Sequence, residues 1–345
     1  MTLNLEKSKV FRLLAIAASV LLVLIIILSI ALYILTLPPG KGENNVEIVI
    51  PIGTSPAAIA EILEDHGVIK NSLLYRLYLR RYNYSSRLQA GIYQLNDGLS
   101  YRELTEILLE GKLKKPTVRF TIPEGLKIQQ IATRLENQGL INKDEFLDLI
   151  QNGEFDYWFI QGIPDNVDYR LEGYLFPDTY EVFEDSSEWE IINIMLRNFE
   201  RNFPEEYRKR AEELGMSVHQ VVTLASIVER EAMVDKERPI IAGVFHNRLK
   251  INMALQSCAT VFYFTEREPV LISDTKIVNP YNTYVFPGLP PGPIGAPGRN
   301  AIHSTLFYEE TDYLYFVTKK DGSGEHYFAR TYEEHLANIA KSNRN

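Results

Sequence analysis

The chain has 345 residues, which is enough for two or more compact domains. Its hydrophobic fraction of 46%, with 20 Tyr and 16 Phe, allows a sizeable core. The formal net charge of −9 argues against a general nucleic-acid-binding protein, because no surplus of basic residues is available to contact phosphates.

The first predicted element is a membrane-spanning helix. From Leu13 to Leu37 the sequence is apolar apart from two Ser, one Tyr and one Thr, and this run is longer than the roughly 20 residues that cross a bilayer. Basic residues in 1–12 predict a cytoplasmic tail, with the remainder of the chain on the outer side of the membrane. A cleaved signal peptide is the alternative, but the run is long for one and lacks a small-residue cleavage site. Residues 38–45 form a linker.

Two copies of one pattern follow, starting at Val46 and Val118. Each predicts a strand, a Pro-x-Gly turn, an amphipathic helix ended by Gly, and a second helix. After the first copy, a return strand and another helix complete a module over 46–117. Small strand–helix modules on an exported chain resemble LysM-type glycan-binding domains, and a plain structural spacer is the alternative. The recurring positions are Ile50, Pro51, Gly53, Ile59, Ala60, Leu63, Glu64, Gly67 and Ile69, which return as Ile122, Pro123, Gly125, Ile131, Ala132, Leu135, Glu136, Gly139 and Ile141.

A helix that begins at a capping-box signature at Ser217 carries the strongest chemical signal. Glu229 projects into its apolar sector, whereas Glu231 falls on the polar side. A carboxylate packed among apolar side chains loses hydration, which predicts a raised pKa and a general acid for use near neutral pH. The alternative is a structural Glu that pairs with Arg238 or Arg248. The apolar sector comprises Val218, Val221, Val222, Ala225, Val228 and Ala232.

After Met253 the sequence favours loops and strands. The run Thr260 to Tyr263 has β-forming residues, and the Gly- and Pro-rich stretch 288–298 predicts a fixed loop around a site. A strand–turn–strand unit is predicted over 313–317 and 326–329. A helix over 331–342 closes the chain.

Cysteine and histidine usage bounds the chemistry. Cys258 is the one cysteine, so no intrachain disulfide forms, and we interpret it as a small packing residue rather than a nucleophile. The six histidines are scattered, with none at a ligand spacing to a second His or Cys. We therefore expect no metal site, and no cofactor is predicted.

Several ordered motifs together resemble the MltG-type (YceG-like) endolytic murein transglycosylases. They are LASIVEREA with RPIIAGVFHNRL, then LQSCATV, YNTY and GLPPGPIGAPG, and LEGYLFPDTY and the YLYFV to HYFA hairpin fit the same pattern. The resemblance covers nearly everything after the linker. It implies an α+β protein with a transmembrane helix, a LysM-like α/β module over 46–117 and a mixed α+β catalytic domain over 118–345, in which 118–165 is the second strand–helix repeat. One departure is Cys258-Ala259, where the family often has Asp-Pro, so no role of that Asp is carried over.

The resemblance implies that Glu229 is catalytic and that four further residues bind substrate around the cleft: Glu172, Gln256, Asn282 and Tyr284. The implied reaction cleaves the β-1,4 bond between N-acetylmuramic acid and N-acetylglucosamine within nascent glycan strands. One carboxylate protonates the glycosidic oxygen and then takes the proton of the muramic 6-hydroxyl, which leaves a 1,6-anhydro end.

The resemblance also implies where the protein acts and what it meets. It places a single-pass protein in the cell (inner) membrane, with its catalytic domain on the periplasmic or extracytoplasmic face. Partners are peptidoglycan strands, the lipid bilayer through Leu13 to Leu37, and peptidoglycan synthases as further candidates. Ending strand elongation is the expected role. Two alternatives stay open: a hydrolytic muramidase with Asp178 or Asp274 as the second carboxylate, and a non-catalytic glycan-binding anchor for cell-wall synthases.

Overall fold

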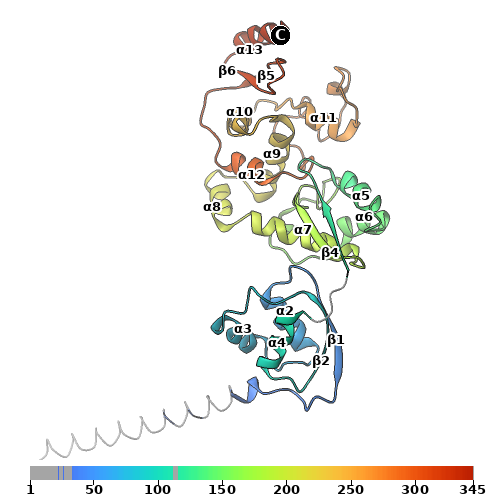
Figure 1. Ribbon diagram of the computed structural model, residues 1–345. Coiled ribbons are helices and arrows are strands. Elements are labelled where there is room, and N and C mark those ends of the chain that lie inside the picture. Colours follow the sequence, from blue (N-terminus) through green and yellow to red (C-terminus); the bar gives the residue numbers. More distant parts are fainter. Residues whose placement is uncertain (1–21, 23–25, 27–32, 112–115, 345) are drawn as a thin grey trace, which may run out of the picture. The chain divides into compact units, whose positions relative to one another are not determined.

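A computed structural model (Figure 1) describes residues 22, 26, 33–111 and 116–344. It divides into two compact units, each of which is described by itself. The N-terminal unit extends to Thr117 and includes Val182–Glu184, and the C-terminal unit comprises Val118–Glu181 and the chain from Asp185 onward.

Most of the predicted membrane helix, Leu13 to Leu37, lies outside the described residues. Within the part of the chain that the structure describes, no helix combines the length and the apolar character needed to cross a bilayer.

The N-terminal unit is a two-stranded sheet covered by helices. β1 (Asn45–Ile50) pairs antiparallel with β2 (Gly91–Asn96), with Asn45 opposite Asn96 and Ile50 opposite Gly91. Alternate strand residues and the apolar helix faces share one core, in which Ile48, Leu63 and Leu95 are fully buried. This is the order of elements that the sequence predicts. The helices are α2 (Pro56–Asp65), α3 (Ser72–Arg81) and α4 (Tyr101–Glu110).

The same order of elements opens the second copy of the repeat. β3 pairs with β4, and the bonds from Ile122 N to the Asp178 carbonyl oxygen (2.9 Å) and from Glu184 N to the Pro116 carbonyl oxygen (3.1 Å) make the pair antiparallel. The strand and two helices predicted for 118–165 are thus present, and a return strand follows after residues 153–178. The elements are β3 (Thr117–Thr121), α5 (Ile128–Glu136), α6 (Lys143–Asn152), β4 (Thr179–Phe183) and α7 (Glu188–Asn202).

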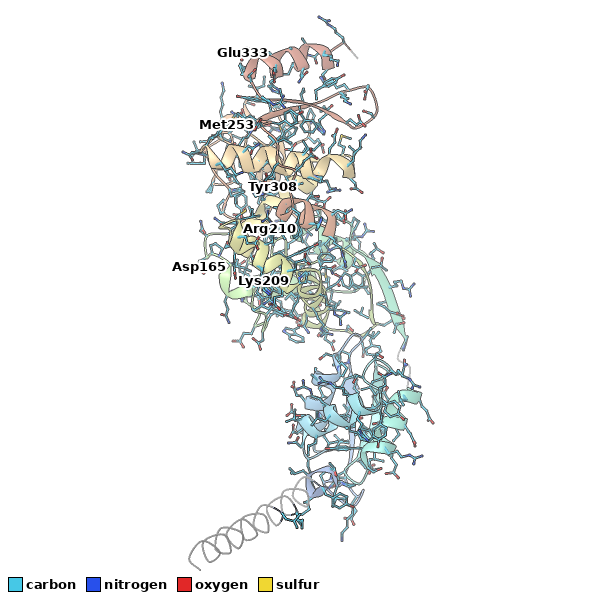
Figure 2. All side chains as sticks on the ribbon, turned by 90° about the vertical axis from the view of Figure 1, so that its left-hand side faces the viewer. Asp165, Lys209, Arg210, Met253, Tyr308 and Glu333 are labelled. Atoms are coloured by element: carbon cyan, nitrogen blue, oxygen red, sulfur yellow. The ribbon has the colours of Figure 1, made fainter. Side chains whose placement is uncertain are left out.

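Helix α9 lies at the centre of the rest of the C-terminal unit, where it contacts α8, α10, α11 and α12. On α8, Arg210 lies beside the end of α12 (Figure 2), and its Nε donates to the Leu306 carbonyl oxygen at 3.1 Å. The remaining elements are α8 (Glu205–Glu213), α9 (Val218–Glu231), α10 (Arg238–Lys250), α11 (Cys258–Thr265), α12 (Arg299–Leu306), β5 (Tyr315–Thr318), β6 (His326–Ala329) and α13 (Tyr332–Ser342), with short 3-10 turns at Ile160–Gly162, Asp235–Glu237 and Asp274–Lys276.

The strand expected over Thr260 to Tyr263 is wrong, because these residues lie in helix α11. Packing of α11 on α9 overrides the local preference of β-branched residues. The Thr260 hydroxyl donates to the Ser257 carbonyl oxygen at 2.8 Å, so a helical turn satisfies it. The predicted hairpin is confirmed, with Tyr315 opposite Ala329 and Thr318 opposite His326.

Candidate active site

Glu229 lies in the last turn of α9, and its side chain is only 6% exposed. The helix begins where the sequence predicts: the N–H of Gln220 donates to the Ser217 hydroxyl at 3.1 Å, which completes the capping box. The apolar face of α9 is buried over Val221 to Val228. These interactions fix the direction in which the Glu229 side chain leaves the helix.

The Glu229 carboxylate is held by one charged and one backbone donor. Arg238 Nη1 lies 2.8 Å from Oε1, and the Gly298 N–H donates to Oε2 at 2.9 Å. Arg238 is itself oriented by Asp235, whose Oδ1 lies 2.8 Å from its Nε. The sequence left pairing with Arg238 open as an alternative, and that pairing is present. Both carboxylate oxygens therefore accept a hydrogen bond, which fixes the orientation of the group.

A second carboxylate, which the sequence analysis missed, lies beside this one. Glu124 follows Pro123 in the turn before α5, and a Cβ placed on Gly298 would lie only 1.7 Å from its Oε1. The turn is bonded to the Gly-Pro-rich loop, because the Gly125 N–H donates to the Ala296 carbonyl oxygen at 2.7 Å. Partial burial raises the pKa of Glu124, and the nearby charge of Glu229 raises it further.

Glu172 lies in a separate cavity of about 560 Å³. Its side chain is fully enclosed, and its carboxylate accepts from the Ile128 N–H at 3.2 Å, at the N-terminus of α5. Burial raises the pKa of Glu172 to about 8, against the opposing effects of this hydrogen bond and of Lys127. Tyr263, whose hydroxyl is buried, lines the same cavity. Glu172 is therefore a buried residue that forms part of the cavity wall.

The other predicted substrate-binding residues separate into two environments. Gln256 and Tyr284 line a cavity of about 410 Å³ together with Cys258, whose Sγ lies 3.1 Å from the Tyr284 hydroxyl. Asn282 is fully buried and spans its own loop: its Nδ2 donates to the Ile277 carbonyl oxygen at 2.7 Å, and its Oδ1 accepts from the Tyr284 N–H at 3.0 Å. Asn282 therefore shapes the loop that carries Tyr284.

Asp178 and Asp274, the two candidates for the second carboxylate of a hydrolase, bind residues other than Glu229 and its partners. Asp178 accepts from Asn198 Nδ2 at 2.9 Å, and the buried Asp274 pairs with Arg267 Nη1 at 2.9 Å. The carboxylate beside Glu229 is instead Glu124. A signal for it exists in the sequence, because the first copy of the repeat has Ile52 at the position of Glu124.

Comparison with known proteins places this geometry in a family. The model of the YceG-like family matches residues 48–341. The chain belongs to the YceG-like family. The endolytic murein transglycosylase of Bacillus subtilis (strain 168) is 35% identical over 306 residues, which is 85% of this chain and 84% of that protein. The enzyme of the same name from Streptococcus pneumoniae serotype 2 (strain D39) is 33% identical over 88% of this chain and 59% of its own length.

A solved structure supports the same assignment. The crystal structure of a yceG-like protein from Listeria monocytogenes is 34% identical, covers 85% of this chain and 99% of its own, and has a TM-score of 0.58. The resemblance inferred from the motifs is thereby confirmed.

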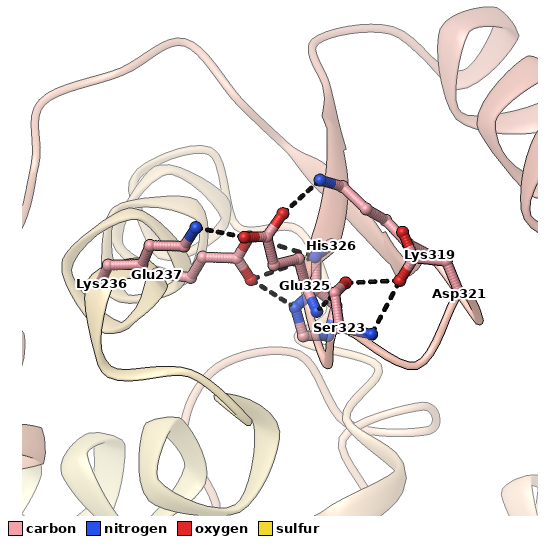
Figure 3. A network of polar contacts seen from close by, with 7 residues as sticks. All are labelled: Lys236, Glu237, Lys319, Asp321, Ser323, Glu325 and His326. Carbon is pink, nitrogen blue, oxygen red and sulfur yellow. Dashed lines mark hydrogen bonds and ion pairs between the residues drawn. The ribbon is translucent and has the colours of Figure 1, made fainter.

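In this YceG-like chain, a polar network supports the segment that carries Arg238 (Figure 3). Glu237 and His326 are both buried, and the His326 Nδ1 lies 2.8 Å from Glu237 Oε2. Glu325 bridges Lys236 and Lys319. The β5–β6 hairpin is thus fastened to the turn immediately before Arg238.

Replacing His326 with Ala should lower the free energy of unfolding by about 1–3 kcal/mol, because the buried Glu237 carboxylate loses a side-chain donor. Urea denaturation of the full-length protein measures this. Lys236→Ala in the same network is the matched comparison. The Lys236–Glu325 ion pair lies at the surface, so its loss should cost less than the loss of the buried His326–Glu237 pair. Equal losses in the two variants would contradict a special role of the buried pair.

Proposed function

We propose that this protein is a membrane-anchored endolytic lytic transglycosylase of peptidoglycan. It cleaves the β-1,4 bond between N-acetylmuramic acid and N-acetylglucosamine within nascent strands and leaves 1,6-anhydromuramic ends. The observation that carries the proposal is Glu229, held at the end of α9 by Arg238 and Gly298. It lies in the motif on which the family resemblance places the catalytic Glu, and relatives in that family bear the name endolytic murein transglycosylase.

The reaction requires two proton transfers, one to the glycosidic oxygen and one from the muramic 6-hydroxyl. The glycosidic oxygen must gain a proton as its bond to the muramic carbon breaks, because an alkoxide is a poor leaving group. The muramic 6-hydroxyl then attacks the positively charged carbon and loses its proton to a carboxylate. No water is consumed, so a second carboxylate is not needed to activate water, unlike in a hydrolase. Glu229 is the carboxylate at the centre of this exchange.

The anchor sets where the reaction happens. Leu13 to Leu37 would hold the catalytic unit on the extracytoplasmic face of the cell membrane, within reach of strands that are still being made. Cleavage at this place ends strand elongation, and synthases that make those strands are candidate partners. The module over 46–117 would bind glycan in the manner of LysM domains. The support for these points is the sequence.

Product analysis tests the reaction type. The full-length protein should release fragments with 1,6-anhydromuramic ends from purified peptidoglycan, detected by mass spectrometry as a mass about 18 Da (one water) below that of the reducing end. Reducing ends would instead identify a hydrolase that uses Glu124 and Glu229 as its two carboxylates. Bound but uncleaved glycan would identify a binding anchor and refute the proposed activity.

A further inference from the structure

Gly298 lies between two carboxylates that come from distant parts of the sequence. Its N–H donates to Glu229 Oε2 at 2.9 Å. On its other side, a Cβ would approach Glu124 Oε1 to 1.7 Å and Cδ to 2.2 Å. Because Gly298 has no side chain, the Glu124 carboxylate can occupy the space where a Cβ would lie. The φ of Gly298 is −77°, which any residue can adopt, so glycine is needed here only to make room for Glu124.

The turn that carries Glu124 can be compared with the equivalent turn in the first copy of the repeat, which lies in the N-terminal unit. Gly53 and Gly125 occupy the same place in the two copies, with φ of +78° and +76°. The residue before the glycine is Ile52 in the first copy and Glu124 in the second. The turn therefore forms without a carboxylate, so the acid at position 124 is not required for the turn itself.

The two carboxylates differ in what surrounds them. The Glu229 side chain is enclosed and paired with Arg238, whereas the Glu124 residue is exposed and its carboxyl group is only partly buried. Two adjacent carboxylates do not both ionise easily, so the proton is held by Glu124, which forms no ion pair with the residues that the structure describes. The charged groups that face Glu124 are Glu229, Asp235 and Arg238, and its pKa is raised by burial and by both acids, with only Arg238 opposing.

We propose that Glu124 is a second catalytic carboxylate, which donates the proton to the glycosidic oxygen while Glu229 acts as the base. This inference rests on the proposed transglycosylase activity. The Glu124 proton joins the glycosidic oxygen as that oxygen leaves the muramic carbon. The muramic 6-hydroxyl oxygen bonds to this carbon and gives its proton to Glu229. After product release, that proton returns from Glu229 to Glu124, which restores the resting state.

An activated leaving group separates the two roles. The full-length protein and its variants are compared on peptidoglycan and on a glycan oligomer that carries a 4-nitrophenyl group on a terminal N-acetylmuramic acid. Nitrophenolate leaves without protonation, so it does not need the acid. Glu124→Gln should lose about 10²-fold or more in rate on peptidoglycan but less than about 5-fold on the nitrophenyl substrate. Glu229→Gln should lose rate on both.

Two further variants keep the test independent of folding. Glu124→Ile copies the turn of the first repeat, and Gly298→Ala displaces the Glu124 side chain while its own backbone conformation remains allowed. Both should show the same split between substrates as Glu124→Gln. The rate of the wild type on peptidoglycan should fall at high pH as Glu124 loses its proton, and this limb should be absent in Glu124→Gln.

The outcomes distinguish this inference from the proposed function. Anhydro ends from a Glu124→Gln variant of unchanged rate would overturn the role of Glu124 and leave Glu229 as the single acid and base. An equal loss on both substrates would reduce Glu124 to a positioning residue and would also overturn the inference. Failure of the wild type to form anhydro ends would instead refute the proposed function itself.

Discussion

Replacing Glu229 with Gln is expected to lower the rate of anhydromuramic end formation by about 10²–10⁴-fold. Gln keeps the shape of the side chain and can still accept from the Gly298 N–H, but it can neither take a proton from the muramic 6-hydroxyl nor pair as an anion with Arg238. Mass spectrometry of peptidoglycan treated with equal amounts of wild type and variant measures the loss.

A matched control for Glu229→Gln is Glu212→Gln, which makes the same chemical change on the exposed face of α8. It should retain the wild-type rate. Binding of the Glu229→Gln variant to insoluble peptidoglycan should also be retained, because the substitution removes a proton acceptor and leaves the glycan-contacting surfaces in place. Full activity of Glu229→Gln would place the catalytic carboxylate elsewhere.

The second large effect concerns stability and Glu172. The pKa of this buried carboxyl is about 8 in the folded protein, well above its value in the unfolded chain. Its contribution to stability is thus fully present below about pH 4.5 and is lost as pH rises through about 8. Glu172→Gln cannot ionise, so the difference in stability between variant and wild type should shift in favour of the variant over this range. The total shift should be on the order of 3–5 kcal/mol.

Urea denaturation at intervals from pH 4.5 to 8.5 measures the Glu172 effect. The side chain introduced by Glu172→Gln can still accept from the Ile128 N–H through its amide oxygen, so the helix N-terminus stays satisfied. The control is Glu136→Gln, which makes the same chemical change on the exposed side of α5. A pH-independent difference for Glu172→Gln would contradict a buried carboxyl that is protonated at neutral pH.

Local sequence patterns predicted much of the fold. The capping box predicted at Ser217 begins a helix in the structure, and strand alternation around a turn identified the β5–β6 hairpin. The helical position of α11 was not predictable in this way. Its β-branched residues favour a strand locally, and only packing against α9 makes the helix the better state.

The site was predictable only in part, because periodicity describes one helix at a time. It placed Glu229 on the buried face of α9, and pairing with Arg238 was foreseen as an alternative. It could not show that Glu124 lies beside Gly298, since that proximity depends on how the turn before α5 meets the Gly-Pro-rich loop. Likewise, Asn282 carries the same amide whether it binds a sugar or its own loop, and only the structure shows the loop contacts.

The hydrogen bond from Gly298 to Glu229 also determines when the site can form as the chain is synthesised. The bond between Glu229 and Gly298 joins residues 69 positions apart, and contacts of such separation form late because the intervening chain must first be ordered. A nascent chain that has not yet delivered α12 therefore contains every residue of the catalytic helix but lacks the amide that orients Glu229. The site is therefore complete only after the chain has been synthesised through Gly298, and any shorter chain lacks this hydrogen bond to Glu229.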